Sequence, residues 1–204
     1  MIAFEQNGYD IARGVVSKDA ARLMAIEFQM YRDNYYYTNK IDQNNLFHSN
    51  DSQVEKSFSW YGAYCFESLL DYMTPKMEEL TGKSLYPTYS YARIYYNGAE
   101  MQRHLDRTSC QYSATITIEI DDTGPWEIYM EDYSGEAHPL ILNVGDICIY
   151  RGDKLKHWRD DYKGKKQIQA FLHYVDVNSE YATDKFDRRN LLGGERDPAA
   201  WGLR

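Results

Sequence analysis

One histidine and one aspartate, separated by a single residue, stand at the start of a run of alternating residues. They are His104 and Asp106, in the stretch "MQRHLDRTSCQYSATITIEI". The alternation that follows them is typical of a half-buried strand. Because residues i and i+2 of a strand point to one face, both side chains can reach the same metal ion. A third ligand must then come from a neighbouring strand.

His157 is the candidate for that third ligand. It follows "GDICIYRGDKLK", in which Gly145 and Asp146 predict a turn, residues 147–150 a strand, and the remainder a short loop. Two histidines and one carboxylate on one face leave three adjacent coordination positions open. That arrangement is typical of non-haem Fe(II) centres that activate oxygen.

The other histidines carry weaker signals. His48 and His138 lie in loop-like sequence and are assigned no role. We expect His173, on the last predicted strand, to be a core imidazole rather than a ligand.

The composition is that of a β-rich globular protein. The chain has 204 residues, of which 43% are hydrophobic and 26% charged, enough for one domain with its own core. Aromatic residues make up 15%, with 20 tyrosines, and aromatic residues favour strands. The net charge of −8 without a basic stripe argues against a nucleic-acid partner.

Cysteine usage and hydropathy indicate the compartment. The three cysteines, Cys65, Cys110 and Cys148, are odd in number and lack C-x-x-C spacing. This argues against a disulfide framework and favours a reducing compartment. We find no signal segment and no membrane-spanning apolar run. We therefore expect a soluble cytoplasmic protein without a membrane partner.

Residues 1–84 are predicted to be mostly helical. A short strand over 8–16 leads to Ser17, a good N-cap, and residues 18–31 carry apolar residues at helical spacing. The polar, tyrosine- and asparagine-rich residues 34–58 predict a long loop.

A second helix is expected over residues 61–73. A third begins at Pro75 and ends at Gly82, since proline suits the first turn of a helix and glycine its end.

Residues 85–177 change to short alternating runs divided by Gly, Asp, Asn and Pro. The runs are "LYPTYSYARIYYN", "SATITIEI", "EIYME", "AHPLIL", "GDICIYRG" and "KQIQAFLHYVDV". Short antiparallel strands closed by turns are typical of a sandwich or jelly roll. We expect one domain over 1–204, with a polar tail at 178–204 that packs on the core or stays loose.

Two stretches carry a resemblance to a known family. "YARIYYNGAEMQRHLD" resembles the first signature of the prolyl-4-hydroxylase-like 2-oxoglutarate/Fe(II) oxygenases: a strand with a tyrosine, a glycine turn, then His-x-Asp. "GDICIY", followed by His157 and "KQIQAFLHYVD", is similar to the second. The fuller pattern, "HLDRTSC" with "HWRDDYKGKKQIQAFLHYVD", is similar to oxygenases of marine bacteria and phages. The resemblance covers about residues 85–177.

The resemblance implies a mainly β fold, a cupin-like double-stranded β-helix or jelly roll behind N-terminal support helices. It implies His104, Asp106 and His157 as catalytic iron ligands, with 2-oxoglutarate as cosubstrate, O2, and ascorbate as an auxiliary reductant. The implied activity couples decarboxylation of 2-oxoglutarate to hydroxylation of a C–H bond. The substrate is a protein or peptide, prolyl residues included, or a small molecule, and the oligomeric state is left open.

The resemblance also implies cosubstrate contacts. Tyr95 aligns with the family's cosubstrate-contacting tyrosine. The family's basic residue on the last strand falls here on Lys166 or Gln167: one register points Gln167 inward and Lys166 outward, and a slip of one residue reverses this. Because a buried carboxylate needs a charged or multi-donor partner, Arg93, on the face of Tyr95, and Arg159 are further candidates.

The substrate contacts and the function keep alternatives. Arg107, Arg159 and Trp158 are candidate substrate contacts, although Arg107 also suits a turn and Trp158 a core. A cupin-like metalloenzyme without 2-oxoglutarate is one alternative, favoured by Gln167. A non-catalytic β-sandwich binding module is the other, and it predicts that no metal binds.

Overall fold

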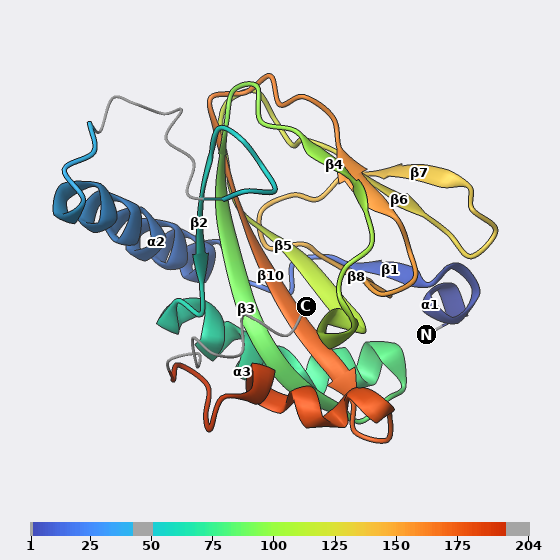
Figure 1. The fold of residues 1–204 in the computed structure, drawn as a ribbon. Coiled ribbons are helices and arrows are strands. Elements are labelled where there is room, and N and C mark those ends of the chain that lie inside the picture. Colours follow the sequence, from blue (N-terminus) through green and yellow to red (C-terminus); the bar gives the residue numbers. More distant parts are fainter. Residues whose placement is uncertain (1, 43–50, 195–204) are drawn as a thin grey trace.

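A computed structural model describes residues 2–42 and 51–194 (Figure 1). Their strands form two antiparallel sheets. The first has the order β1 (Tyr9–Ala12), β8 (Ile147–Tyr150), β5 (Tyr112–Ile120), β10 (Lys166–Asp176), β3 (Leu85–Tyr96), β2 (Ser57–Tyr61). The second has the order β4 (Met101–His104), β9 (His157–Arg159), β6 (Ile128–Glu131), β7 (Ala137–Leu140).

Helices accompany the larger sheet. They are α1 (Ile2–Asn7), α2 (Lys18–Thr38) and α3 (Tyr64–Thr81), with 3-10 segments η1 (Thr108–Cys110) and η2 (Glu180–Arg188). None of the helices among the described residues combines the length and hydrophobicity that crossing a bilayer requires.

From β3 onward the chain passes back and forth between the two sheets. β3, β5, β8 and β10 belong to the six-stranded sheet, and the intervening β4, β6, β7 and β9 form the four-stranded one. The fold is a double-stranded β-helix, as the sequence predicts. The predicted strand runs match β3, β5, β6, β7, β8 and β10 closely. The short strands β4, which ends at His104, and β9, which begins at His157, were not expected as separate strands.

The six-stranded sheet has two different faces. On one face Ile168, Ala170 and Leu172 of β10 form a core with Phe28 of α2 and Leu70 of α3. The residues between them face the smaller sheet, and there a second core joins the sheets through side chains such as Met101, Met130, Tyr95 and Phe171. Figure 1 shows α2 on the opposite side of β3 and β10 from β4, β6 and β7.

Helix α2 extends beyond its predicted end. Ser17 caps it by accepting a hydrogen bond from the Ala20 amide. The helix continues to Thr38 and β2 begins at Ser57, so the predicted loop over 34–58 is wrong at both ends. Tyr36 explains the extension, because its ring is buried and packs edge-on against Phe58 of β2. Residues 43–50 of that predicted loop lie outside the described residues.

Helix α3 is continuous where two helices were predicted. It runs through Pro75 and ends at Gly82, whose φ of 66° provides the expected left-handed cap. Pro75 lacks the amide that would bond the Asp71 carbonyl, but both residues are exposed, so water can satisfy that carbonyl.

Both ends of the described chain support the sheet. β1 and β2 form its two edges, so residues 1–84 contribute strands as well as helices. The tail packs back on the core: Arg189 donates to a buried carboxylate, that of Glu67 on α3, at 2.9 Å. The last ten residues, 195–204, lie outside the described range.

Candidate metal centre

The two predicted histidine ligands face each other across neighbouring strands. His104 ends β4, His157 begins β9, and the two are register partners with ring centroids 4.3 Å apart. The Nδ1 atom of His104 lies 2.7 Å from the Gln102 carbonyl oxygen, and that of His157 lies 3.0 Å from the Leu155 carbonyl oxygen. A carbonyl only accepts, so Nδ1 carries the proton in both rings. Each Nε2 lone pair is therefore free to bind a cation.

Asp106 completes the group. Its Oδ1 atom lies 3.6 Å from the Nε2 atoms of both His104 and His157. One ligand atom from each of the three residues lies within 4.8 Å of the other two. The structure thus brings together two imidazole nitrogens and one carboxylate oxygen, the donor set of the facial triad.

The loop after β8 holds the Asp106 carboxylate in place. The Asp106 amide donates to the Gly152 carbonyl at 2.8 Å. A Cβ atom at Gly152 would collide with Asp106 Oδ2 and with the hydroxyl of Ser113. Glycine is therefore required at position 152 for the carboxylate to lie where it does.

The protonation states suit a cation. Burial raises the pKa of Asp106, but the nearby His157 and His104 outweigh this effect and bring the pKa to about 2. Burial also lowers the pKa of His157. For His104 burial acts in the same direction, but hydrogen bonding to Asp106 and the Gln102 carbonyl raises its pKa overall. At neutral pH Asp106 is ionised and His157 neutral, the states in which these groups bind metals.

Two buried arginines face the space between the sheets, and within the described residues only Arg93 has a counterion. Its Nε donates to Asp51 Oδ2 at 2.7 Å, and its remaining nitrogens contact Asp51, Gln53 and Tyr95. Asp51 also accepts a hydrogen bond from the Tyr91 hydroxyl. The charge of Arg93 is neutralised inside the protein.

Arg159 lacks such a partner. Its side chain is 1% exposed, and Nη1 donates to the Trp126 carbonyl at 2.6 Å. Among residues 2–42 and 51–194, no partner bonds its Nε and Nη2. Burial lowers the pKa of Arg159, but a guanidinium stays protonated at neutral pH. It is a buried cation with two free donors.

Tyr95 shares a neighbour with Arg159, and Gln167 is the strand partner of Tyr95. Gln167 is fully buried, and both atoms of its amide lack partners within the described part of the chain. It is the register partner of Tyr95 on β3. The rings of Tyr95 and Trp126 meet edge-on at 5.1 Å, and the Arg159 guanidinium lies 4.9 Å from the Trp126 ring centroid. Tyr95 and Arg159 therefore contact the same ring, that of Trp126, and Gln167 lies opposite Tyr95 on the adjacent strand; we call these three residues the interior group.

Two predicted site residues lie elsewhere. Lys166 points to the helix-covered face, where its Nζ lies 2.6 Å from both Glu119 Oε1 and Gln29 Oε1. Trp158 faces outward between His157 and Arg159 and stacks on Tyr129 at 5.3 Å. Strand alternation explains both orientations. Lys166 is adjacent to the inward-facing Gln167, and Trp158 is adjacent to the inward-facing Arg159, so each points to the opposite face.

Arg107 stays close to the metal ligands at the protein surface. Its side chain is 40% exposed, lies over the ring of Tyr89, and bonds Asp187 of η2 at 2.9 Å. Asp187 also accepts a hydrogen bond from the Tyr61 hydroxyl. The C-terminal segment thus holds the residue that follows Asp106.

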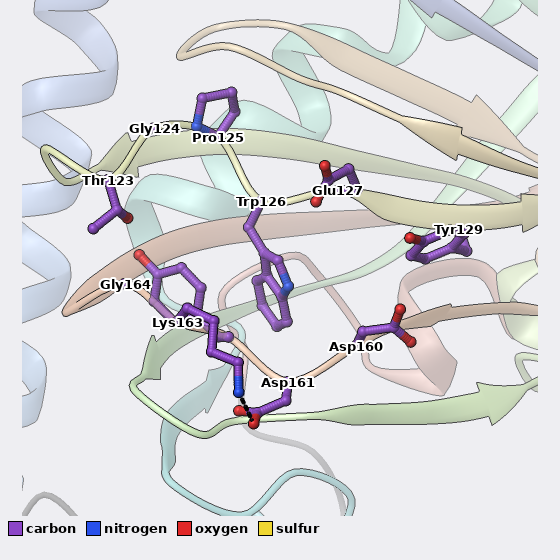
Figure 2. Close-up of a pocket in the computed structure, with 11 residues that line it drawn as sticks. Thr123, Gly124, Pro125, Trp126, Glu127, Tyr129, Asp160, Asp161, Lys163 and Gly164 are labelled. Carbon is purple, nitrogen blue, oxygen red and sulfur yellow. Dashed lines mark hydrogen bonds and ion pairs between the residues drawn. The ribbon is translucent and has the colours of Figure 1, made fainter.

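A separate pocket of about 270 Å³ lies where the β5–β6 and β9–β10 connections meet. Figure 2 shows Trp126 at its centre, with Asp160, Asp161 and Lys163 around it and Lys163 paired with Asp161. None of the three triad residues lines it. Trp126 links it to the interior group, since the same residue contacts Arg159.

Comparison with solved structures identifies the architecture. A prolyl-4-hydroxylase from Pseudomonas putida superposes with a TM-score of 0.64 and 12% identity over 86% of this chain and 96% of that one. AviO1 from Streptomyces viridochromogenes gives 0.63 and 13% over 87% and 94%. HygX from Streptomyces hygroscopicus, solved with nickel, 2-oxoglutarate and hygromycin B, gives 0.62 and 10% over 87% and 86%.

The fold is that of the 2-oxoglutarate/Fe(II) oxygenases. No protein-family model and no curated protein matches the chain by sequence. At 10–13% identity the oxygenase likeness is one of fold. Whether the chain shares the chemistry depends on its own side chains.

The residues fit both groups that the oxygenase fold implies. The triad presents three ligand atoms of the kind that Fe(II) accepts. Arg159 and Gln167 hold unpaired buried donors, which a carboxylate would satisfy. The helix-facing Lys166 supplies no such donor to the interior.

Sequence reasoning missed three residues near the site. Ser113 donates to Asp106 Oδ2 at 3.2 Å, His173 Nδ1 lies 2.9 Å from the Ser113 hydroxyl, and Asp51 neutralises Arg93. Burial lowers the pKa of His173 to about 4, so its ring is neutral. His173 is buried, as expected, but it contacts the site. No local sequence signal marks these residues: His173 and Asp51 lie 60 and 42 positions from their partners, and Ser113 lies seven positions beyond Asp106.

Proposed function

We propose that this protein is a non-haem Fe(II) oxygenase that uses 2-oxoglutarate and O2 to hydroxylate a C–H bond. The observation that carries the proposal is the combination of the triad with a buried arginine that lacks a counterion on the same strand as His157. Side chains two residues apart on a strand lie about 6.6 Å apart. That separation suits a small dicarboxylate held by metal at one end and a cation at the other.

His104, Asp106 and His157 would hold the iron. Fe(II) with bound 2-oxoglutarate supplies the oxidising chemistry, in which the cosubstrate becomes succinate and CO2 and one oxygen atom enters the substrate. The protein holds the ligands on one face and excludes water. The backbone carbonyls that fix both Nδ1 protons keep the imidazoles oriented toward the ion.

Arg159 and Gln167 would bind the distal carboxylate of 2-oxoglutarate. The Nε and Nη2 atoms of Arg159 can donate in parallel to its two oxygens, and the Gln167 amide adds another donor. Tyr95 borders the same group, through Trp126. In this arrangement the cation that binds the carboxylate is Arg159 of β9. The last strand, β10, contributes only the neutral amide of Gln167.

The substrate class remains a protein or peptide, or a small molecule. Arg107 is a partly exposed cation next to the metal ligands, so it is our candidate for a substrate contact. Its bond to Asp187 and its contact with Tyr89 hold it in one orientation.

The decisive experiment is calorimetric titration of 2-oxoglutarate into the anaerobic Mn(II) or Fe(II) protein. We expect binding that requires metal and is lost in His104→Ala. Arg159→Met should weaken 2-oxoglutarate binding about 10- to 100-fold, because it removes charge-assisted hydrogen bonds. The metal affinity should stay unchanged. Lys166→Gln is the matched control: it removes a cation from β10, which belongs to the other sheet, and should have no effect.

The possible outcomes separate three functions. Metal binding without 2-oxoglutarate binding would favour a metalloenzyme of another kind. Absence of metal binding would contradict the proposal and favour a non-catalytic module. If Arg159→Met binds 2-oxoglutarate as tightly as the unmodified protein, the oxygenase function would stand. The distal carboxylate would then be bound by a residue other than Arg159.

A further inference from the structure

The two oxygens of Asp106 contact different groups. Oδ1 lies 3.6 Å from the Nε2 atoms of His104 and His157 and so faces the metal position. Oδ2 accepts a hydrogen bond from the Ser113 hydroxyl at 3.2 Å. Ser113 lies at the start of β5 and is fully buried. One oxygen is available for metal, and the other is already bonded.

The Ser113 hydroxyl has a second partner on the next strand. His173 of β10 is its register partner, and His173 Nδ1 lies 2.9 Å from Ser113 Oγ. A hydroxyl has one proton to donate and lone pairs to accept with. If His173 Nδ1–H donates to Ser113, the Ser113 proton remains for its two acceptors, Asp106 Oδ2 at 3.2 Å and the Cys110 carbonyl oxygen at 3.1 Å. In this direction the proton is shared between the carboxylate and the carbonyl, and the charged carboxylate is the stronger acceptor. In the opposite direction Oδ2 has no donor from Ser113.

His173 is itself held in place. It is 5% exposed, and its ring packs on Tyr89 with centroids 4.5 Å apart. Tyr89 stacks in turn on Tyr61 at 5.2 Å. The chain of contacts from His173 to Asp106 therefore starts from a packed ring on a central strand.

We propose that His173 and Ser113 are positioning residues that hold Asp106 as a one-oxygen metal ligand. The inference rests on the proposed metal site. If Oδ2 were unbonded, the carboxylate could rotate and bind the ion with both oxygens. That would occupy a coordination position that cosubstrate or O2 needs. Hydrogen bonds to the outer atom of a metal ligand typically change metal affinity or activity by about 10- to 100-fold.

A second cation behind Asp106 is the competing interpretation. Asp106, Cys110 and His173 also bring ligand atoms within 4.8 Å of one another. However, Ser113 Oγ bonds both Asp106 Oδ2 and His173 Nδ1 and thus occupies the space between them. Cys110 Sγ is paired with the Tyr89 hydroxyl at 3.1 Å. These contacts favour the hydrogen-bonded chain.

The test is anaerobic titration with Co(II), read from its d–d absorption, on five proteins. They are the unmodified chain, Ser113→Ala, His173→Phe, His173→Asn and Ser90→Ala. His173→Phe keeps the ring packing and removes the donor, and the amide of His173→Asn restores a donor near Nδ1. Ser90→Ala is the matched control, because Ser90 is also a buried serine that donates to a carboxylate, that of Glu67, away from the triad.

We expect one Co(II) per chain in the unmodified protein. Ser113→Ala and His173→Phe should weaken Co(II) binding about 10-fold or more and shift the d–d bands. His173→Asn should recover most of the affinity. Ser90→Ala should lower thermal stability but leave the Co(II) affinity and spectrum unchanged.

Three results would overturn the inference. If Ser113→Ala has the same Co(II) affinity and spectrum as the unmodified protein, Ser113 does not position Asp106. The proposed metal site would still stand. A second Co(II) per chain that disappears in His173→Phe would replace the hydrogen-bonded chain with a metal site. If the unmodified protein itself binds no Co(II), the proposed function fails together with the positioning role.

Discussion

The two faces of the six-stranded sheet differ in the side chains that they bury. The face toward the helices buries apolar side chains, and the face toward the smaller sheet also buries polar ones. On β10, Ile168, Ala170, Leu172 and Tyr174 face the helices and belong to the larger core. Their neighbours Gln167, Gln169, Phe171 and His173 are equally buried but face the smaller sheet. Burial alone therefore does not distinguish the faces; the chemistry of the buried groups does.

The difference shows where stability and function are located. Apolar burial against the helices stabilises the fold, whereas a buried polar group costs free energy unless it is paired. Gln169 is paired, through Thr115 and Thr117. Gln167 and two donors of Arg159 have no partner in the part of the chain that the structure describes. Unpaired buried groups mark the place where a ligand can complete the hydrogen bonding.

The largest expected effect is on the helix-facing side. Leu172→Ala should lower the free energy of unfolding by about 4 kcal/mol, because it opens a cavity in a fully buried apolar core. Urea unfolding measures this change. Below the unfolding transition, Co(II) affinity should equal that of the unmodified protein. Weaker metal binding in the folded variant would mean that the two faces are not independent.

The paired arginine of the interior gives the next effect. Asp51→Asn should cost about 3 kcal/mol at neutral pH, because it leaves Arg93 buried without its counterion. Burial raises the pKa of Asp51, but the Arg93 charge and hydrogen bonds outweigh this and hold it below the ordinary 3.8. The ionised Asp51 carboxylate therefore stabilises the folded protein fully above pH 3.8, the ordinary pKa. This stabilisation is lost as the pH falls through the lowered pKa of the folded protein.

Urea unfolding at neutral pH and near pH 3 tests that pair. The difference in stability between the unmodified protein and Asp51→Asn should shrink in acid. A difference that stays constant would mean that Asp51 is not ionised in the folded protein.

A smaller effect, of opposite sign, is expected at Gln167. Gln167→Met has a similar shape and removes an unpaired amide, so it should raise stability by about 1 kcal/mol. It should also weaken 2-oxoglutarate binding about 5-fold, the equivalent of one modest hydrogen bond. Thermal unfolding and calorimetry on the same samples measure both quantities. A loss of stability would show that the amide is satisfied in the free protein.

The smallest effect belongs to Lys166, the residue adjacent to Gln167. Its ion pair with Glu119 joins side chains that are 27% and 30% exposed. Lys166→Gln should therefore change stability by less than about 1 kcal/mol, and 2-oxoglutarate affinity should not change. A clear drop in cosubstrate affinity would place the anchor on Lys166 and contradict the register of β10.

Much of the fold follows from local patterns. Alternating residues predict the long strands, and Ser17 and Gly82 mark helix ends that the structure confirms. The same alternation groups Gln167 with Gln169, Phe171 and His173. It could not say which face that group occupies, because a slip of one residue exchanges the faces. The pairing of Gln167 with Tyr95 on β3 and Ile120 on β5 decides the question.

Helix lengths depend on tertiary contacts more than on propensity. Residues 34–38 look like a polar loop, but the burial of Tyr36 against Phe58 keeps them helical. Pro75 looks like a helix start, but α3 passes through it because both of its ends pack on the sheet and the lost hydrogen bond faces water.

The sequence by itself determined the three candidate ligands, but not the short strands β4 and β9 that carry the two histidines. Residue type and spacing are enough to select them, although Asp106 lies two residues beyond the end of β4 and is held by its bond to the Gly152 carbonyl rather than by a strand. Only the tertiary structure decided which buried arginine is free. Asp51 lies 42 positions before Arg93 in the chain and neutralises it, while no described residue does the same for Arg159. A counterion is a matter of distance in space, and periodicity along a chain carries no information about it.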